Sequence, residues 1–317
     1  MKAAIVGGRG QSPVCGSFAA PQAAAGEVLV AVTAAALCPL TRIRAAGTHY
    51  SASGSFPLVA GVDGVGRLDD GRRVYFLLPR APYGSMAGLA PVSGSHVIAV
   101  PDGLDDVAAA ALANPGMSSW AAFTARARLK PGETVLINGA TGASGRLAVQ
   151  IARHFGAGKV IATGRNTAVL RELEALGADV TMPLAGDRAA LTEAFRSHFA
   201  AGVDVVVDYL WGESAECLLA AAAKTAVEGV PVRFVQVGSS GGTEITLPAA
   251  VLRSSGLELM GSGIGSVPLA GLLDAIAGVF GAALDGGLSL PVRTMPLSAV
   301  AEAWQDDGRA GRVVLTP

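Results

Sequence analysis

The sequence predicts an α/β protein in which a doubly wound parallel sheet follows a β-rich N-terminal part. Before residue 130, short apolar runs are separated by Gly, Pro and Asp, as in strands joined by tight turns. After residue 130, β-branched apolar runs alternate with segments of helical length, which is typical of successive βαβ units. With 317 residues, the chain is long enough for two domains.

Composition argues against two classes of partner. Hydrophobic residues make up 51% of the chain and charged residues 15%, which is enough apolar material for a large core. The formal net charge of −1 gives no general attraction for nucleic-acid phosphates or anionic lipids. An aromatic content of 5% leaves little surface on which bases could stack. We therefore expect no nucleic-acid partner.

The cysteines and the apolar segments favour a cytoplasmic protein without a membrane partner. Cys15, Cys38 and Cys217 are spaced neither like a disulfide framework nor like a metal cluster. The apolar run at the start is too short for a signal peptide. The longest stretch without a charged residue, 107–125, contains Asn-Pro-Gly, and we interpret it as buried helices broken by a turn.

In the β-rich part, strands are predicted at residues 27–33, 73–78 and 96–100, each an apolar run bounded by Gly, Pro or Asp. In the alternating part, the core runs are apolar without alternation, as in strands that are covered on both faces. These strands are predicted at 134–138, 159–163, 203–208 and 232–237, with a weaker one at 179–182. The intervening helices are predicted at 143–155, 167–176, 187–199 and 213–224, followed by a helix at 269–284 and a last strand at 312–315.

A glycine-rich turn between the strand at 134–138 and the helix behind it is the strongest chemical signal. Its sequence, GATGASG, matches G-x-x-G-x-x-G, a relative of the dinucleotide-binding fingerprint. Glycine is needed because the backbone must turn sharply and approach a pyrophosphate without an intervening Cβ atom, and the following helix presents unpaired N–H groups to the anion. An empty glycine turn is the alternative. We predict a Rossmann dinucleotide site at Gly139, Ala140, Thr141, Gly142, Ala143, Ser144 and Gly145.

The residues after the next strand predict which dinucleotide binds. A site for NAD usually carries an acidic residue there, which hydrogen-bonds the ribose 2′-hydroxyl. The sequence instead has Gly164, Arg165 and Asn166. Arg165 could bind a 2′-phosphate through charge-assisted hydrogen bonds, and Asn166 could add one more. We therefore expect NADPH as the cofactor, with a solvated surface arginine as the alternative interpretation.

Three further segments are expected to complete the cofactor crevice, because ligands of open parallel sheets bind at the carboxyl ends of the strands. Tyr209 follows the strand at 203–208 and would flank the pyrophosphate and the ribose. Val237 and Gly238 end the strand at 232–237 and would approach the nicotinamide. Ile264 is expected to contribute backbone contacts.

With this turn placed behind a β-rich part, the whole chain resembles the zinc-free, zeta-crystallin-like quinone oxidoreductases of the medium-chain dehydrogenase/reductase superfamily. The segments that carry the resemblance are AGVDGVG at 60–66, KPGETVL at 130–136, the glycine turn, GVDVVVD at 202–208 and GRVVL at 311–315. It implies a GroES-like catalytic domain at 1–117, a Rossmann NADPH-binding domain at 118–260, and a return to the catalytic domain at 261–317. It also implies a homodimer that pairs through an edge of the Rossmann sheets.

The zinc branch of this superfamily fits the sequence poorly. Cys38 stands where zinc enzymes place their first cysteine ligand, but their Gly-His-Glu segment reads Gly61-Val62-Asp63 here, and a valine cannot coordinate zinc. Residues 79–102 contain no cysteine, so the four-cysteine structural lobe is missing as well. We expect no metal, and we interpret Cys38 as a buried or pocket-lining thiol.

The resemblance also implies catalytic candidates. Thr41 and Ser118 match family positions that face the nicotinamide, and Tyr50 falls on a loop that overhangs the site in relatives. The Tyr50 hydroxyl could hydrogen-bond a carbonyl or donate a proton, although an ordinary surface aromatic is the alternative. Relatives commonly have Asn-Pro-Val-Asp where this chain has Cys38-Pro39-Leu40-Thr41, so their amide and their carboxylate are both missing.

Without a Lewis acid, the alkoxide formed from an isolated ketone is hard to stabilise, so a conjugated acceptor is favoured. We predict an NADPH-dependent oxidoreductase that transfers hydride to a quinone without metal or flavin. An NADPH-dependent enone or enoyl reductase and a noncatalytic NADPH-binding protein are the alternatives.

Overall fold

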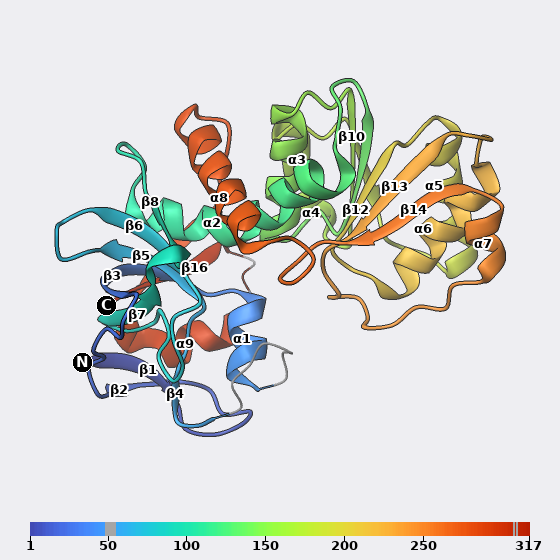
Figure 1. The fold of residues 1–317 in the computed structure, drawn as a ribbon. Helices are drawn as coiled ribbons and strands as arrows, with labels where there is room; N and C mark the ends of the chain where they lie inside the picture. The colour runs from blue at the N-terminus through green and yellow to red at the C-terminus, as the bar shows by residue number, and fades with distance from the viewer. Residues whose placement is uncertain (48–54, 307, 309) are drawn as a thin grey trace. The chain divides into compact units, whose positions relative to one another are not determined.

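A computed structural model describes residues 1–47, 55–306, 308 and 310–317 (Figure 1). The chain forms two compact units. The first unit comprises Met1–Asn114 and Val279–Pro317, and the second comprises Pro115–Gly278. The second unit is therefore inserted into the sequence of the first.

The second unit is built on a six-stranded sheet whose strands all run parallel, in the order β11-β10-β9-β12-β13-β14. Consecutive strands diverge from β9 in opposite directions, so the switch point of the doubly wound fold lies between β9 and β12. The predicted Rossmann architecture is confirmed. The strands are β9 (Thr134–Asn138), β10 (Lys159–Gly164), β11 (Val180–Pro183), β12 (Val205–Asp208), β13 (Pro231–Gln236) and β14 (Gly256–Gly261).

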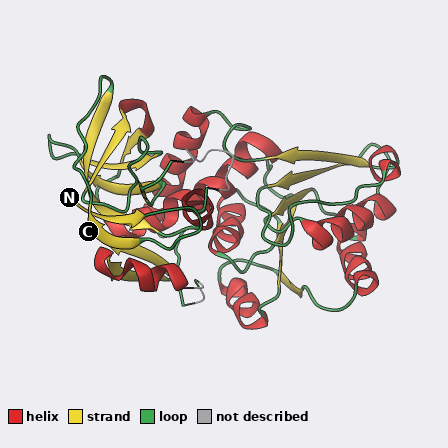
Figure 2. Ribbon diagram, turned by 90° about the horizontal axis from the view of Figure 1, so that it is seen from below, coloured by secondary structure: helices red, strands yellow, loops and turns green. Residues whose placement is uncertain are grey.

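Helices pack on this sheet (Figure 2). Because the sheet is covered, the middle residues of β9 are fully buried and need no polar alternation. On one face, Phe195 of α5 and Leu218 of α6 share a core cluster with Leu136, Val206 and Phe234 of the strands. The helices are α3 (Ala143–His154), α4 (Thr167–Ala175), α5 (Arg188–Ala200), α6 (Gly212–Thr225) and α7 (Ala249–Arg253).

The first unit is β-rich. One sheet has the order β2-β1-β4, and a second has the order β15-β16-β3-β5-β6-β8 with β7 also paired to β3. The C-terminal strand β16 pairs antiparallel with β3, which brings the end of the chain back to the N-terminal part. The elements are β1 (Lys2–Val6), β2 (Val14–Ser17), β3 (Glu27–Ala36), α1 (Pro39–Ala45), β4 (Leu58–Val59), β5 (Asp63–Arg67), β6 (Arg73–Leu77), β7 (Leu89–Ser93), β8 (Val97–Ala99), β15 (Val292–Pro296), α9 (Val300–Gln305) and β16 (Arg312–Thr316).

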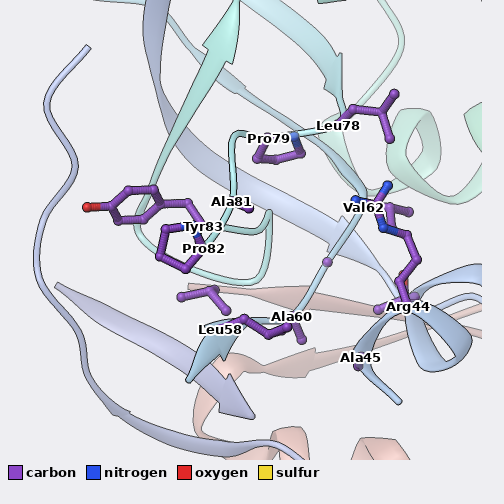
Figure 3. A pocket seen from close by; sticks show the side chains of 13 residues that line it. Arg44, Ala45, Leu58, Ala60, Val62, Leu78, Pro79, Ala81, Pro82 and Tyr83 are labelled. Atoms are coloured by element: carbon purple, nitrogen blue, oxygen red, sulfur yellow. The ribbon is translucent and has the colours of Figure 1, made fainter. Parts of the chain in front are cut away.

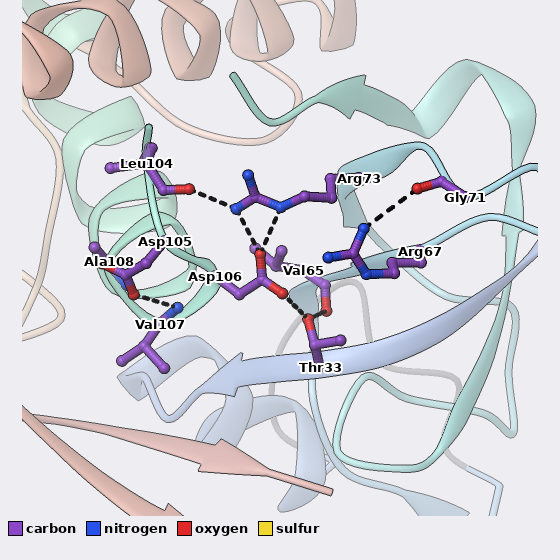
Figure 4. Close-up of polar contacts among 10 residues, drawn as sticks. All are labelled: Thr33, Val65, Arg67, Gly71, Arg73, Leu104, Asp105, Asp106, Val107 and Ala108. Carbon is purple, nitrogen blue, oxygen red and sulfur yellow. Dashed lines mark hydrogen bonds and ion pairs between the residues drawn. The ribbon is translucent and has the colours of Figure 1, made fainter. Parts of the chain in front are cut away.

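The helix α2 (Asp106–Ala121) is anchored in the first unit by its first residue (Figure 4). The Asp106 carboxylate accepts a hydrogen bond from Thr33 Oγ1 at 2.6 Å and forms an ion pair with Arg73 at 2.6 Å. Asp105 caps the same helix, because its Oδ1 accepts from the backbone N–H groups of Val107 and Ala108. Carboxylates at this end also complement the helix dipole.

The turn expected within residues 107–125 is wrong, because α2 continues through Pro115. A proline removes one backbone donor, so the carbonyl of Ala111 loses its partner within the helix. The Ser118 hydroxyl donates to the Pro115 carbonyl itself. Four alanines and Leu112 at 109–113 are buried, as is Ala121, so packing favours a continuous helix over the local preference for a turn. A π-helical segment, Ala122–Ala127, follows directly.

The domain boundaries expected after residues 117 and 260 stay a prediction. The chain passes between the two compact units at two positions. The first lies between Asn114 and Pro115, and the second lies within α8 (Leu269–Leu284), between Gly278 and Val279. Residues 261–278 belong to the second unit because Val267, Leu272 and Ala275 pack with Ala121 in one apolar cluster, against which Trp120 also packs. Within the described residues, no helix is long and apolar enough to span a membrane.

The strand β14 is missing from the prediction. It is the edge strand of the parallel sheet, and its residues Glu258 and Leu259 are exposed. Its sequence therefore lacks the continuous apolar run that marks strands covered on both faces. The other predicted elements lie within three residues of the bounds observed in the structure.

Candidate functional site

The three glycines of the turn between β9 and α3 meet three different requirements. Gly139 has φ of +87°, in the left-handed region that favours glycine. A Cβ atom on Gly145 would lie 2.5 Å from the carbonyl oxygen of Gly139 and would overlap Ala140, so this glycine allows α3 to pack against the turn. A Cβ atom on Gly142 would meet no atom within 4 Å, so the backbone is open to an outside group at this point.

The helix α3 begins directly behind Gly142, its N-cap residue, with no side-chain cap. Its first N–H groups therefore have neither an intrahelical acceptor nor a capping side chain. Helix N-termini of this kind bind phosphate through backbone N–H groups and the helix dipole. The open glycine and the uncapped helix thus fit the diphosphate of a dinucleotide.

The turn is held against the end of β10. The backbone N–H of Ala140 donates to the carbonyl oxygen of Thr163 at 2.7 Å. A Cβ atom on Gly164 would overlap the side chain of Thr141, so a larger residue here would force that side chain to move. The predicted residues from Gly139 to Gly145 therefore lie next to the predicted Gly164.

A buried polar network, which the sequence patterns did not predict, lies beneath the turn. Asn138 Nδ2 donates to Asp208 Oδ1 at 2.8 Å and to Ser214 Oγ at 2.9 Å. Thr163 Oγ1 donates to Asn138 Oδ1 at 2.8 Å, and the Gly139 N–H donates to Thr163 Oγ1 at 3.3 Å. The sequence signal that could have indicated this network is a polar residue at or near the end of each of three apolar strands, namely Asn138, Thr163 and Asp208. The network joins the ends of β10, β9 and β12 at the switch point.

Asp208 is fully buried, and burial raises the pKa of its carboxyl group. Besides Asn138, it accepts hydrogen bonds from the backbone N–H groups of Leu210 and Trp211 at 3.0 Å and 3.1 Å. These bonds shape the chain immediately after β12. The predicted residue Tyr209 lies between Asp208 and Leu210, which one of these hydrogen bonds joins.

The Tyr209 hydroxyl lies 2.7 Å from Ser119 Oγ, and Ser119 Oγ also donates to the Ser144 carbonyl at 3.0 Å. Ser119, which no sequence motif indicated, therefore connects α2, the chain after β12 and the first turn of α3. Burial raises the pKa of Tyr209, and the hydroxyls of Ser119 and Ser118 oppose that shift. The predicted residue Ser118 donates to the Pro115 carbonyl at 2.8 Å.

Arg165 and Asn166 follow β10 and are both exposed. Asn166 has a structural role that was not foreseen: it caps α4, with Oδ1 accepting from the N–H groups of Ala168 and Val169 at 3.1 Å and 3.2 Å. No ion pair or hydrogen bond joins the Arg165 side chain to another residue that the structure describes. Its guanidinium group is therefore available to a ligand.

The segment after β13 lies against the segment after β12. The N–H groups of Val237 and Gly238 both donate to the Asp208 carbonyl, and a Cβ atom on Gly238 would lie 2.7 Å from the Tyr209 carbonyl oxygen. The predicted residues Tyr209, Val237 and Gly238 thus come together at the carboxyl ends of β12 and β13. Ile264 packs against the apolar cluster of Val267 and Leu272, and its expected backbone contacts to the cofactor stay a prediction. A cavity of about 420 Å³ lies at the ends of β13 and β14, lined by Trp211, Gln236, Ser239, Thr243, Leu259, Met260 and Gly261.

In the first unit, Thr41 lines a pocket together with Val62 (Figure 3). Cys38 is the N-cap residue of α1, with its Sγ 3.4 Å from the Thr41 backbone nitrogen, which donates to it, and 3.2 Å from Thr41 Oγ1. Cys38 is buried, and burial raises the pKa of its thiol. Tyr50, the third catalytic candidate, lies outside the described residues.

Asp63 stands where zinc enzymes carry glutamate and is buried in the first unit. The Tyr75 hydroxyl donates to Asp63 Oδ2 at 2.8 Å, and burial raises the pKa of Asp63 to about 6. The described residues contain no group of three or more His, Cys, Asp or Glu side chains that could hold a metal ion.

Comparisons with known proteins agree with this fold. Residues 143–277 match the family model described as zinc-binding dehydrogenase. The chain is 30% identical to the "Probable NADPH-dependent quinone reductase tdiC" of Emericella nidulans, over 92% of each chain. The structure of the quinone oxidoreductase from Thermus thermophilus, also solved with NADPH, has a TM-score of 0.81 and 27% identity, with 100% of both chains covered. A mycobacterial quinone oxidoreductase has a TM-score of 0.85 and 22% identity, again with 100% of both chains covered.

The fold and the glycine turn together define a dinucleotide-dependent oxidoreductase. The chain belongs to the quinone oxidoreductase family of the medium-chain dehydrogenases/reductases. The predicted family and fold class are thereby confirmed, including the β-rich catalytic part from which the Rossmann part is inserted.

Proposed function

We propose that this protein is an NADPH-dependent quinone oxidoreductase that works without a metal ion. The observation that carries the proposal is the open cradle at Gly142, which precedes an uncapped helix. Beside it lies β10, which is followed by Arg165 instead of an acidic residue. The NADPH-dependent quinone reductase among its relatives supports the same choice of cofactor and acceptor.

The described residues fit this cofactor. The backbone from Gly142 to Gly145 would bind the diphosphate, and Arg165 would bind the 2′-phosphate of the ribose. Tyr209, Val237 and Gly238, which the strand ends bring together, would line the remainder of the groove. When bound, the nicotinamide ring supplies the hydride.

The absence of a metal is proposed from the residue at position 62. A valine there cannot replace the ligand histidine of the zinc enzymes. The protein must then align the acceptor, exclude water and polarise one oxygen, and a quinone accepts electrons without a Lewis acid because its conjugated system disperses the charge. Thr41 in its pocket and Ser118 are the hydroxyl groups proposed for that polarisation. Treatment with a chelator should leave the rate unchanged.

The function is tested by following NADPH oxidation with a benzoquinone and with an α,β-unsaturated ketone of similar size. Faster turnover of the quinone is the expected result. Faster turnover of the ketone would instead favour an enone reductase. If the protein bound NADPH tightly but reduced neither acceptor, it would be a noncatalytic binding protein.

Replacing Arg165 by alanine is expected to raise the KM for NADPH by about 10-fold to 100-fold, because a charge-assisted contact to the 2′-phosphate is lost. The KM for NADH should stay nearly unchanged. Steady-state kinetics with both cofactors measures the two effects. Arg171→Ala, an exposed charge loss on α4, is the matched control and should change neither value. Equal effects of Arg165→Ala on both cofactors would refute the assigned role.

We further propose a homodimer that forms through β14. This strand is the edge of the parallel sheet, and an edge presents unpaired N–H and C=O groups. Leu252 of α7 and Val230 just before β13, the neighbouring strand, are 43% and 48% exposed, and Leu259 on β14 is 37% exposed. A second copy could cover these apolar side chains by symmetric pairing.

Leu259→Arg is expected to shift the protein from dimer to monomer in sedimentation velocity, because a charge would then be placed in the interface. The matched control is Val14→Arg, a substitution at a residue that is 60% exposed on β2. Dissociation by both substitutions, or by neither, would contradict a β14 interface.

A cytoplasmic location is also proposed. All three cysteines are free thiols, and two of them, Cys38 and Cys217, are buried. This pattern suits a reducing compartment. Fractionation of cells that produce the protein would test the location.

A further inference from the structure

A small pocket of the first unit contains one charged side chain. The pocket is formed by α1, by the segment at 58–62 and by the loop after β6 (Figure 3). Its walls are mainly apolar, and they include Val62, Leu78 and Pro79. Among the residues that line it, only Arg44 is charged. Figure 3 shows the Arg44 guanidinium group directed toward Val62 and Leu78.

Arg44 has no partner within the described parts of the chain. No ion pair or hydrogen bond joins its guanidinium group to another described residue, and the sequence of residues 48–54 contains no carboxylate. Arg42, on the same helix, differs: its guanidinium group donates to the carbonyls of Trp304 and Asp306 and lies over the Trp304 ring. Arg42 therefore stabilises the fold, whereas Arg44 faces the pocket.

An arginine in this environment favours an anion. Arg44 is half-buried, and burial lowers its pKa because the charged form loses contact with water. Charged groups that are withdrawn from water are normally paired, since an unpaired charge is costly. A carboxylate or sulfonate would supply that partner, and the planar guanidinium fork can bind either one with two hydrogen bonds.

The place of the pocket connects it to the acceptor. Val62 and Thr41 both line this pocket. The resemblance to the quinone oxidoreductases implies that Val62 stands where zinc relatives have a ligand histidine and that Thr41 faces the nicotinamide. The pocket volume of about 40 Å³ is enough for one small polar group but not for a ring system. It therefore suits a substituent of the acceptor better than its reacting ring.

We propose that Arg44 binds an anionic substituent of the acceptor, so that the enzyme prefers quinones carrying a carboxylate or sulfonate over neutral ones. This inference rests on the proposed quinone reductase function and narrows its substrate class. The anionic group takes no part in the reduction. The quinone gains a hydride from NADPH and a proton, and becomes the hydroquinone with its substituent unchanged.

The test compares a naphthoquinone with its monosulfonated derivative in the full-length wild-type protein and in Arg44→Gln. We expect kcat/KM for the sulfonate to fall by about 10-fold to 100-fold in the variant, because a charge-assisted contact is lost. The value for the neutral quinone should change by less than about 2-fold. Arg44→Lys keeps the charge and should retain part of the preference. Comparing each quinone between variants removes the effect of their different reduction potentials.

The matched control is Arg9→Gln, which removes an equal charge from an exposed side chain that donates to the Gly47 carbonyl after α1 but does not line the pocket. It should leave both quinones unaffected. Equal losses for the neutral and sulfonated quinones in Arg44→Gln would overturn the proposal, and so would the absence of any loss. If Arg9→Gln lowered kcat/KM for the sulfonated quinone as well, the effect would be a general electrostatic one, and this outcome would also overturn the proposal.

A second readout does not depend on turnover. Naphthalene sulfonate, which cannot be reduced, should bind to the wild-type protein in calorimetry in the presence of NADP⁺ and should bind at least about 10-fold more weakly to Arg44→Gln. If the wild-type protein reduced neither quinone, the proposed function would fail. Calorimetry would still decide whether Arg44 binds the anion, and equal binding to both proteins would overturn that role.

Discussion

Replacing Gly145 by alanine is expected to weaken NADPH binding by at least about 100-fold and to lower the free energy of unfolding by about 2 to 3 kcal/mol. The new Cβ atom would overlap Ala140 and would lie 2.5 Å from the Gly139 carbonyl oxygen, and both contacts are with backbone. A flexible side chain could move away, but the turn or the start of α3 must shift instead. Either shift displaces the N–H groups proposed to bind the diphosphate. Calorimetry with NADPH and chemical unfolding measure the two effects.

Gly142→Ala is the matched control for this prediction. Its Cβ atom would meet no protein atom within 4 Å, so the free energy of unfolding should change by less than about 1 kcal/mol. NADPH binding should nevertheless weaken by about 10-fold or more, because the methyl group fills the open cradle. Unchanged NADPH binding in both variants would contradict the assignment of the turn as the diphosphate site.

Asp208→Ala is expected to lower the free energy of unfolding by about 3 to 5 kcal/mol, the largest stability effect that we predict. The carboxylate accepts hydrogen bonds from Asn138 Nδ2 and from the backbone N–H groups of Leu210 and Trp211. Alanine leaves these donors without an acceptor at a buried site, and each lost partner costs about 1 to 3 kcal/mol, less whatever entering water recovers. Urea unfolding of the two proteins under identical conditions gives the difference.

The control is Asp208→Asn, which keeps an oxygen at the Oδ1 position that now accepts from Asn138, Leu210 and Trp211. The loss should then be about 1 kcal/mol, because most of the hydrogen bonds can still form. If the asparagine and alanine variants were equally unstable, the negative charge would matter more than the accepted bonds. If alanine caused no loss, the network would have no role in stability.

Some features of this protein follow from short stretches of sequence. The continuous apolar runs of β9 and β10 and the glycine pattern of 139–145 predicted both strands and the turn, because strand burial and the conformational freedom of glycine act over a few residues. The absence of an acidic residue directly after β10 can likewise be recognised from the sequence. The edge strand β14 and the unbroken α2 were missed, because their stability depends on which neighbours cover them.

The candidate site divides in the same way. The sequence by itself predicted the dinucleotide turn and the role of Arg165, and it determined the lack of a histidine at position 62, since each depends on residue types within a short segment. Only the tertiary structure decided that Asn138 and Asp208 share a buried network, and that Arg42 is bound to backbone carbonyls near the end of the chain while Arg44 faces a pocket. The two arginines look alike in the sequence. Their partners are brought near by folding of residues far apart in the chain, and no local pattern encodes such contacts.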